Sequence, residues 1–246
     1  MFIPKSKVPK DKKITHGKIV CEVKPEKEEK ERTILTVGGN LLAFTGNPSA
    51  PTASVFTAKC VFNSVVSTPG SRFLLADIKH LYLNNILLDP EFMRIPLKII
   101  PQEIIDTYDL KSLVDDQRWI YMRIEKGMFF LKQAGIIANQ ELVKHMAPFV
   151  YHLVKHTPCL WVHDSRKTLF SIVVDNFCAQ YCSTGGCRPF LNALRSKYLI
   201  KVDMADTVYI RIKLEWDYGH RTVTLLMPSY VLKALHRFQH ILRGDK

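Results

Sequence analysis

The alternation of apolar and polar positions predicts a domain in which strands and helices are mixed. Apolar runs of strand length occur at 72–77, 119–125, 160–163, 168–174, 177–181, 208–216 and 222–227. Apolar residues at helical spacing predict helices over 53–66, 133–153, 189–198 and 230–242, and 98–115 reads as a short helix with loops. This order favours the α+β class with antiparallel strands.

The N-terminal region differs from the rest in composition. Residues 1–31 are rich in Lys and Glu and end in the run KPEKEEKE, which predicts a solvated, charged arm. No apolar run follows the first basic residues, and no stretch of about 18 apolar residues occurs anywhere, so neither a secretion signal nor a membrane span is expected. We therefore expect an intracellular protein, cytoplasmic or nuclear.

The excess of basic over acidic side chains bears on which molecules the protein binds. The chain has 35 basic and 23 acidic side chains, a formal net charge of +12. Such a surplus favours polyanions, because neutralising phosphates releases their condensed counterions. A soluble protein that is merely basic fits the same composition, so charge alone leaves both interpretations open.

The six cysteines lie at positions 21, 60, 159, 178, 182 and 187. The last three have the spacing C-x3-C-x4-C, which suggests the start of a metal site. A zinc site requires four ligands, usually in closely spaced pairs, and neither C-x2-C nor a suitably placed fourth ligand is present. The favoured interpretation is therefore reduced, intracellular thiols.

Two acidic positions carry the candidate chemistry. Asp77 ends a compact apolar strand, and the dipeptide Asp175-Asn176 separates two β-rich runs, which predicts a tight hairpin because both residue types tolerate a positive φ. Carboxylates at such places can hold the Mg²⁺ ions of two-metal phosphoryl transfer. Taken alone, such an Asp is more commonly an ordinary strand end, and such a dipeptide is more commonly an ordinary turn.

Three segments in order resemble motifs A, B and C of reverse transcriptases. They read FLLADIKHLYLNN (73–85), KGMFFLKQAGIIAN (126–139) and LFSIVVDNF (169–177). The closest similarity is to the copia-type branch of long-terminal-repeat retrotransposons, whose motifs read like D-[IV]-K-x-[FA]-[YF]-L-[NH], Y-G-L-x-Q-[AS] and a hydrophobic pair before D-D. With the flanks EEKERTILTVGG, KHTPCLW and YIRIKLEWDY, the resemblance covers roughly residues 15–240.

The resemblance implies a fold and a domain layout. It implies the fingers and palm of a right-hand polymerase, with an antiparallel palm sheet backed by helices and a truncated thumb. It places a charged arm at 1–31, fingers at 32–70 and 86–132, palm at 71–85 and 133–230, and the start of a thumb-like helix at 231–246. The implied function is RNA-directed DNA synthesis within a Pol polyprotein, on an RNA template and a DNA primer, with deoxynucleoside triphosphates and Mg²⁺ or Mn²⁺.

The resemblance also implies roles for individual residues. Asp77 and Asp175 are the expected metal ligands, and Asn176 takes the second position of the catalytic motif C pair. Tyr82 is expected under the incoming sugar, where it rejects a 2′-hydroxyl, and Gln133 beside the nucleotide and template. Among the fingers residues, Arg32 is expected near the triphosphate, with Lys30 as a lesser candidate. The strand 208–216 resembles the primer grip.

Four positions depart from the family pattern. Asn176 stands where the family has a second Asp, and a neutral amide cannot offset metal charge as a carboxylate does. Phe130 and Arg211 stand where glycine is usual, and Ile34 where an Arg is common. Loss of one metal carboxylate predicts a rate loss of at least about a thousandfold, so this copy is expected to be impaired.

Three readings of function therefore remain. The first is an RNA-directed DNA polymerase, a nucleotidyltransferase. The second is a catalytically dead relic that still binds RNA or an RNA–DNA duplex through its phosphates. The third is an unrelated basic α+β domain.

Overall fold

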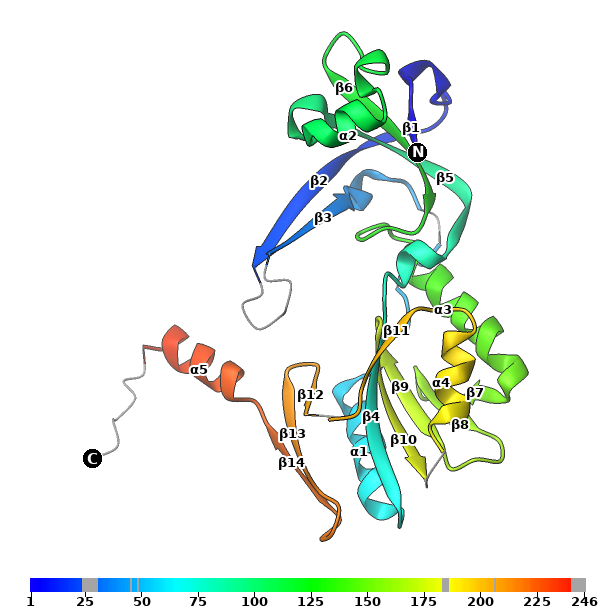
Figure 1. Ribbon diagram of the computed structural model, residues 1–246, viewed down its shortest axis with the longest axis vertical. Coiled ribbons are helices and arrows are strands. Elements are labelled where there is room, and N and C mark those ends of the chain that lie inside the picture. The colour runs from blue at the N-terminus through cyan, green and yellow to red at the C-terminus, as the bar shows by residue number, and fades with distance from the viewer. Residues whose placement is uncertain (24–30, 45, 48, 183–185, 206, 240–246) are drawn as a thin grey trace. The chain divides into compact units, whose positions relative to one another are not determined.

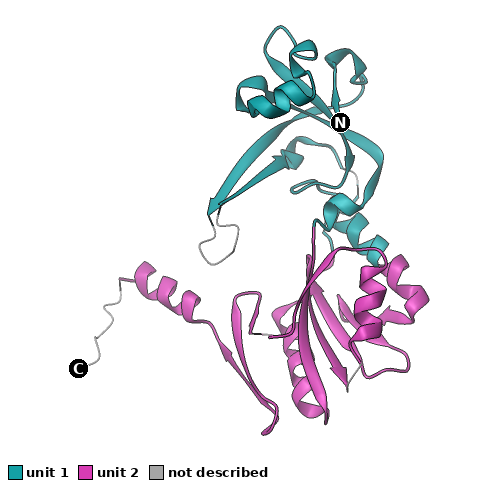
Figure 2. Cartoon of the chain, in the orientation of Figure 1, with its two compact units in different colours: residues 1–50, 80–142 teal, residues 51–79, 143–246 magenta. Residues whose placement is uncertain are grey.

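The computed structural model describes residues 1–23, 31–44, 46–47, 49–182, 186–205 and 207–239. The chain divides into two compact units, both discontinuous in sequence (Figure 2). Unit 1 comprises residues 1–50 and 80–142, and unit 2 comprises residues 51–79 and 143–246. Each unit contains sheet and helix, in keeping with the mixed α and β content expected from the sequence, while the polymerase architecture stays a prediction.

Unit 1 is built on a five-stranded sheet with the strand order β1-β6-β5-β2-β3. Its strands are β1 (Phe2–Ile3), β2 (Ile14–Val23), β3 (Glu31–Val37), β5 (Ile86–Pro96) and β6 (Trp119–Lys126), and α2 spans Gln102–Thr107. β2 and β5 pair in parallel, and the other neighbours are antiparallel. Buried apolar residues of β5, β6 and the helical segments between them, including Ile95, Leu110 and Ile120, form its core.

The described part of the N-terminal region is folded, which differs from the charged arm expected over 1–31. β1 pairs with β6, and β2 pairs with both β3 and β5. Ile3 and Thr15 are buried, whereas Lys18 and Glu22 are exposed. Only the first half of β2 packs against the rest of unit 1, and residues 18–23 are all exposed, so the sequence shows little apolar alternation there. Residues 24–30 lie outside the described residues.

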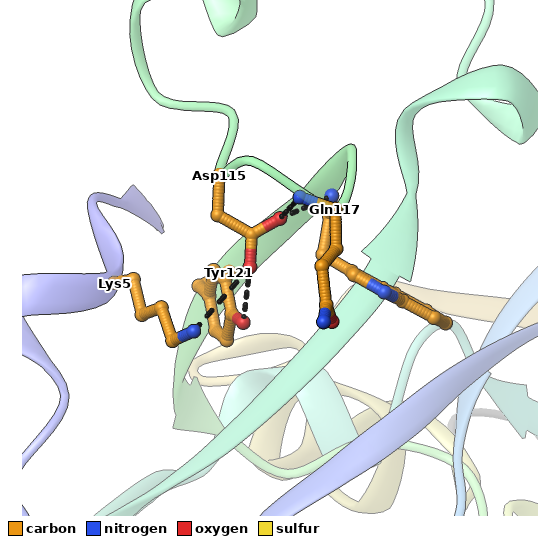
Figure 3. A network of polar contacts seen from close by, with 5 residues as sticks. Lys5, Asp115, Gln117 and Tyr121 are labelled. Carbon is orange, nitrogen blue, oxygen red and sulfur yellow. Dashed lines mark hydrogen bonds and ion pairs between the residues drawn. The ribbon is translucent and has the colours of Figure 1, made fainter.

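A polar network anchors this N-terminal region (Figure 3). The Asp115 carboxylate accepts hydrogen bonds from the backbone N–H groups of Trp119 (2.8 Å) and Gln117 (3.0 Å) and from the Tyr121 hydroxyl (2.8 Å). The Lys5 ammonium lies 3.6 Å from the same carboxylate. Burial alone would raise the pKa of Asp115, but the hydrogen bonds outweigh it and lower the pKa.

Unit 2 contains a six-stranded sheet with the order β11-β4-β10-β9-β8-β7, antiparallel throughout (Figure 1). Its strands are β4 (Ser71–Ile78), β7 (Tyr151–Leu153), β8 (Leu160–His163), β9 (Leu169–Val173), β10 (Asn176–Cys182) and β11 (Ile200–Asp203). Helices α1 (Val55–Ser67) and α4 (Arg188–Arg195) accompany it. The Ser54 side chain caps α1 by accepting a hydrogen bond from the Thr57 N–H at 3.0 Å.

Both faces of this sheet are covered by apolar side chains. On one face, Phe73, Leu75 and Cys178 pack with the buried stripe of α1, which includes Val61 and Phe62. The opposite face is aromatic, with ring contacts among Trp161, Phe170, Phe177 and Phe190. Because side chains alternate along a strand, β4 and β10 contribute to both cores, and a central pair of this kind is rigid.

The long helix predicted over 133–153 is shorter in the structure. Helix α3 spans Ala134–Met146, and the chain then turns through Pro148 and through Val150, whose φ is 58°. The next residues form β7, which pairs with β8. Tyr151 and its neighbours belong to a strand of the sheet instead of continuing the helix, although the apolar spacing runs on past Met146. The prediction was therefore wrong for the C-terminal end of this helix.

The single strand predicted over 208–216 is a hairpin. Strands β12 (Val208–Tyr209) and β13 (Ile212–Asp217) are joined by Ile210 and Arg211, with φ values of 50° and 66°. β14 (Thr222–Leu226) completes a three-stranded sheet, and α5 (Pro228–Arg237) follows with no buried residue. Positive φ at both central residues is the pattern of a type I′ turn, which usually has Asn-Gly, so the sequence lacked the signal.

Candidate functional site

The tip of the β9–β10 hairpin carries the motif C residues. Val173 pairs with Asn176, so the two-residue connection consists of Val174 and Asp175. The turn therefore begins one residue earlier than the predicted Asp175-Asn176 connection, and Asn176 is the first residue of β10. Val174 has a φ of 61°, a strained conformation for a β-branched residue. Such strain persists only where the surroundings enforce it.

Asp77 lies beside this tip. It pairs with Asn176 across β4 and β10, and the next backbone N–H, that of Ile78, donates to the Asp175 carbonyl oxygen at 3.0 Å. Asp77 and Asp175 are half-buried, and Asn176 is exposed. The sheet register thus brings the backbone of Asp77 beside the hairpin tip that carries Asp175, although 97 residues of chain separate the two acidic residues.

A row of four residues crosses the sheet at this level. Lys201 of β11 pairs with Asp77, Asp77 with Asn176, and Asn176 with Val173, and we call these four the tip row. Paired residues of antiparallel strands project from the same face, so Lys201 brings an exposed positive charge to the face of Asp77. Lys201 could not be identified as a candidate site residue from the sequence, because no motif marks a lysine in a four-residue edge strand.

The side chain of Asn176 is engaged with its neighbour. Its Nδ2 donates to Oδ1 of Asp175 at 2.7 Å. An amide donor in this position occupies one carboxylate lone pair that would otherwise be available to a cation. With Asn176 in place of a carboxylate, the tip has one negative charge fewer than the motif C pattern and has a hydrogen bond that competes for Asp175.

The donor set fits a divalent cation in part. Carboxylate oxygens of Asp77 and Asp175 are hard ligands of the kind that Mg²⁺ prefers. Among the residues that the structure describes, no group of three or more His, Cys, Asp or Glu side chains is arranged to hold a metal ion. The tip therefore offers two carboxylates and one amide, and the third acidic ligand of the family pattern is replaced by Asn176.

The expected nucleotide-binding residues all belong to unit 1. Gln133 donates from Nε2 to Oε1 of Glu91 at 2.9 Å, and Tyr82 is half-buried with its ring edge-on to Phe129, 5.4 Å between centroids. Arg32 is half-buried on β3, opposite Glu22 of β2. Lys30 lies outside the described residues. The contacts of Gln133 and Tyr82 are structural contacts within unit 1, and their proposed nucleotide roles stay predictions.

The two positions where the family pattern has glycine share an unusual backbone. Phe130 has a φ of 69° and Arg211 a φ of 66°. A positive φ is uncommon for residues other than glycine, at a few per cent of cases. Its presence at both positions is therefore hard to attribute to chance. The fourth departure, Ile34, is half-buried on β3 opposite Val20 and has no positive φ.

The cysteines form no metal cluster within the described residues. Cys178 is fully buried, and burial raises the pKa of its thiol to about 11. Its Sγ lies 3.0 Å from the Ser171 hydroxyl oxygen, within hydrogen-bond distance. A thiol with so high a pKa is protonated at neutral pH, which makes it a poor nucleophile and metal ligand.

Comparison with known proteins adds no identification: neither a family model nor a curated protein matches this chain. Among the described residues, none of the helices has the length and apolar character needed to cross a lipid bilayer.

Proposed function

We propose that the chain is a reverse transcriptase domain of the copia type, from a retrotransposon Pol polyprotein, in a copy with impaired polymerisation. The observation that carries this proposal is the pairing of Asp77 with Asn176 beside the turn residue Asp175. Asp77 and Asp175 lie in two segments that resemble motifs A and C independently of each other, and the pairing of β4 with β10 is a further observation that supports the proposal.

The position of Asp77 beside the hairpin tip is compatible with phosphoryl-transfer chemistry. Asp77 and Asp175 would hold Mg²⁺ or Mn²⁺, and such a cation, when bound, stabilises the charge that develops on a reacting phosphate. The protein's own contribution is rigidity, because β4 and β10 are central strands packed on both faces. In the proposal, Arg32, Tyr82 and Gln133 contact the incoming deoxynucleoside triphosphate.

The backbone at the former glycine positions supports descent from such an enzyme. Phe130 and Arg211 keep a conformation that favours glycine, although neither is glycine. This is the result expected when side chains change while the fold is retained. The proposal places the protein inside the cell, in cytoplasm or nucleus, with an RNA template and a DNA primer as partners.

A primer-extension assay with Mg²⁺ and with Mn²⁺ tests the proposal. We expect extension by the natural chain to be at least about a thousandfold slower than by the Asn176→Asp variant, since the variant restores a carboxylate and removes the amide donor. The activity gained must disappear again in Asp77→Ala/Asn176→Asp. Rapid extension by the unmodified chain would overturn the impairment.

The second reading, a relic that binds nucleic acid without copying it, is favoured by Phe130 and Arg211, two bulky residues at positive φ where the family pattern has glycine. It predicts that the Asn176→Asp variant remains inactive while the chain still binds an RNA–DNA duplex. The logarithm of the binding constant should fall linearly with the logarithm of the salt concentration. Failure to bind RNA, DNA or their duplex at low salt would instead support the third reading, a basic domain unrelated to polymerases.

A further inference from the structure

Phe130 combines backbone strain with exposure. It lies in the loop between β6 and α3, its φ is 69°, and its side chain is 72% exposed. The described residues with a positive φ include no other Phe, Tyr or Trp. Its neighbour Phe129 behaves differently, because that ring is half-buried and packs edge-on against Tyr82.

The surrounding backbone fixes this conformation. The Phe129 carbonyl oxygen accepts a hydrogen bond from the Val37 N–H at 3.3 Å, and the Leu131 N–H donates to the Met128 carbonyl oxygen at 3.2 Å. A Cβ added to Gly39 would lie 1.9 Å from the Phe130 carbonyl oxygen. The loop is therefore in close contact with the end of β3, and Phe130 cannot leave its strained conformation without breaking these contacts.

The exposed phenyl ring itself contributes little burial to offset the strain. Strained, exposed residues of this kind occur at ligand-contacting sites. Basic side chains flank Phe130 along the chain: Lys126, the last residue of β6, is exposed, and Lys132 is half-buried and donates to the Leu42 carbonyl oxygen at 2.9 Å. The nearby Glu125 is within 3.4 Å of Arg123, which offsets its charge.

We infer that Phe130 is a stacking residue for an unpaired base of a bound RNA or DNA strand. This inference rests on the proposed function, since it takes nucleic acid as the ligand. The face of an aromatic ring accepts any base, and adjacent lysines attract the phosphates that link such bases. A base that is already paired within a duplex has its faces covered, so the expected ligand is single-stranded.

Binding of the full chain to a fluorescent single-stranded oligonucleotide tests the inference. Phe130→Gly should raise the thermal unfolding midpoint, because glycine adopts the positive φ without strain. The same variant should bind about tenfold more weakly, since a base–aromatic stack contributes about 1–3 kcal/mol and each 1.4 kcal/mol is a factor of ten. Phe130→Trp should retain the natural affinity.

The salt dependence and a matched variant separate stacking from other causes. The slope of log affinity against log salt should be equal for the natural chain and Phe130→Gly, because no phosphate contact is removed. Val150→Gly, which relieves a φ of 58° at an exposed aliphatic residue, should gain stability without losing affinity. Equal affinity of Phe130→Gly and the natural chain would overturn the inference alone. Absence of any binding by the natural chain would overturn the proposed function.

Discussion

Two hairpins of unit 2 begin their turns with a β-branched residue at positive φ, in different surroundings. The β9–β10 turn has Val174 at a φ of 61°, and the β12–β13 turn has Ile210 at 50°. Both residues are β-branched, and neither turn has the glycine or asparagine that positive φ usually requires. What differs is the support beneath each turn.

The β9–β10 hairpin is central and packed on both faces. Phe170 and Phe177 are fully buried, and β10 has β4 on its other side. The β12–β13 hairpin belongs to a three-stranded sheet, in which Tyr209 and Ile212 are buried but Val208 is 54% exposed and the end strand β14 has no buried residue. A packed core can enforce a strained turn, so we expect the strain at Val174 to hold Asp175 in place, whereas the strain at Ile210 lowers stability without positioning any candidate site residue.

Removing a central ring should have the largest effect. Phe170→Ala is expected to lower the free energy of unfolding by about 3–5 kcal/mol, because it deletes a buried ring that contacts Trp161 and Phe190 and leaves a cavity. Urea unfolding followed by circular dichroism measures the loss. Leu225→Ala on β14, a residue 37% exposed, serves as the control and should cost about 1 kcal/mol or less. Similar losses for the two variants would contradict the difference in support.

Giving the second hairpin the usual turn residues should have a smaller effect of opposite sign. Ile210→Asn with Arg211→Gly suits the positive φ at both positions and should stabilise the chain by about 1 kcal/mol. The gain in stability is measured as a higher urea concentration at the unfolding midpoint, with the dependence of the unfolding free energy on urea unchanged. A destabilised double variant would show that Ile210 or Arg211 makes contacts that outweigh the strain.

The smallest effect concerns the β8–β9 turn at the other end of the same sheet. Nδ1 of His163 accepts hydrogen bonds from the Ser165 and Arg166 N–H groups, both at 3.1 Å. Burial and the positive charge of Arg166 lower the pKa of His163, while Asp164 opposes the shift and the ring of Tyr151 packs edge-on against it. His152, 2.8 Å from Asp164, also lowers it.

Because the folded-state pKa of His163 is depressed, the unfolded chain takes up a proton first as pH falls. The stability that His163 contributes is therefore complete above its ordinary pKa of about 6.5 and is lost as pH falls through the folded value. In His163→Asn the side-chain oxygen can accept the same bonds without titrating. As the pH falls from 7 to 5, the natural chain should therefore lose more free energy of unfolding than the His163→Asn variant does. A difference independent of pH would contradict the assignment.

The sequence predicted the part of unit 2 that follows simple patterns. Helix α1 and strands β4, β8, β9 and β10 lie within one or two residues of their predicted positions, because their apolar residues form compact runs that pack against the faces of the sheet. The two candidate carboxylates were also found, since each ends an apolar run. Their mutual placement depends on the pairing of β4 with β10, which is a long-range contact that no local pattern encodes.

Other features lacked a local signal. The turn residues Val174, Ile210 and Arg211 have no preference for a positive φ, so their conformation is set by the strands around them. The exposed second half of β2 shows little apolar alternation, and apolar spacing that served β7 lengthened the predicted helix beyond Met146. Lys201 became relevant only through its pairing with Asp77.

Binding of Mn²⁺, followed by electron paramagnetic resonance of the free ion, tests most directly whether Asp77 and Asp175 form one cation site. We predict saturable binding by the natural chain that is lost in Asp77→Asn and equally in Asp175→Asn. Asp164→Asn, which alters an exposed carboxylate at the opposite end of the sheet, should bind as the natural chain does. Unchanged Mn²⁺ affinity in both Asp77→Asn and Asp175→Asn would contradict the shared site.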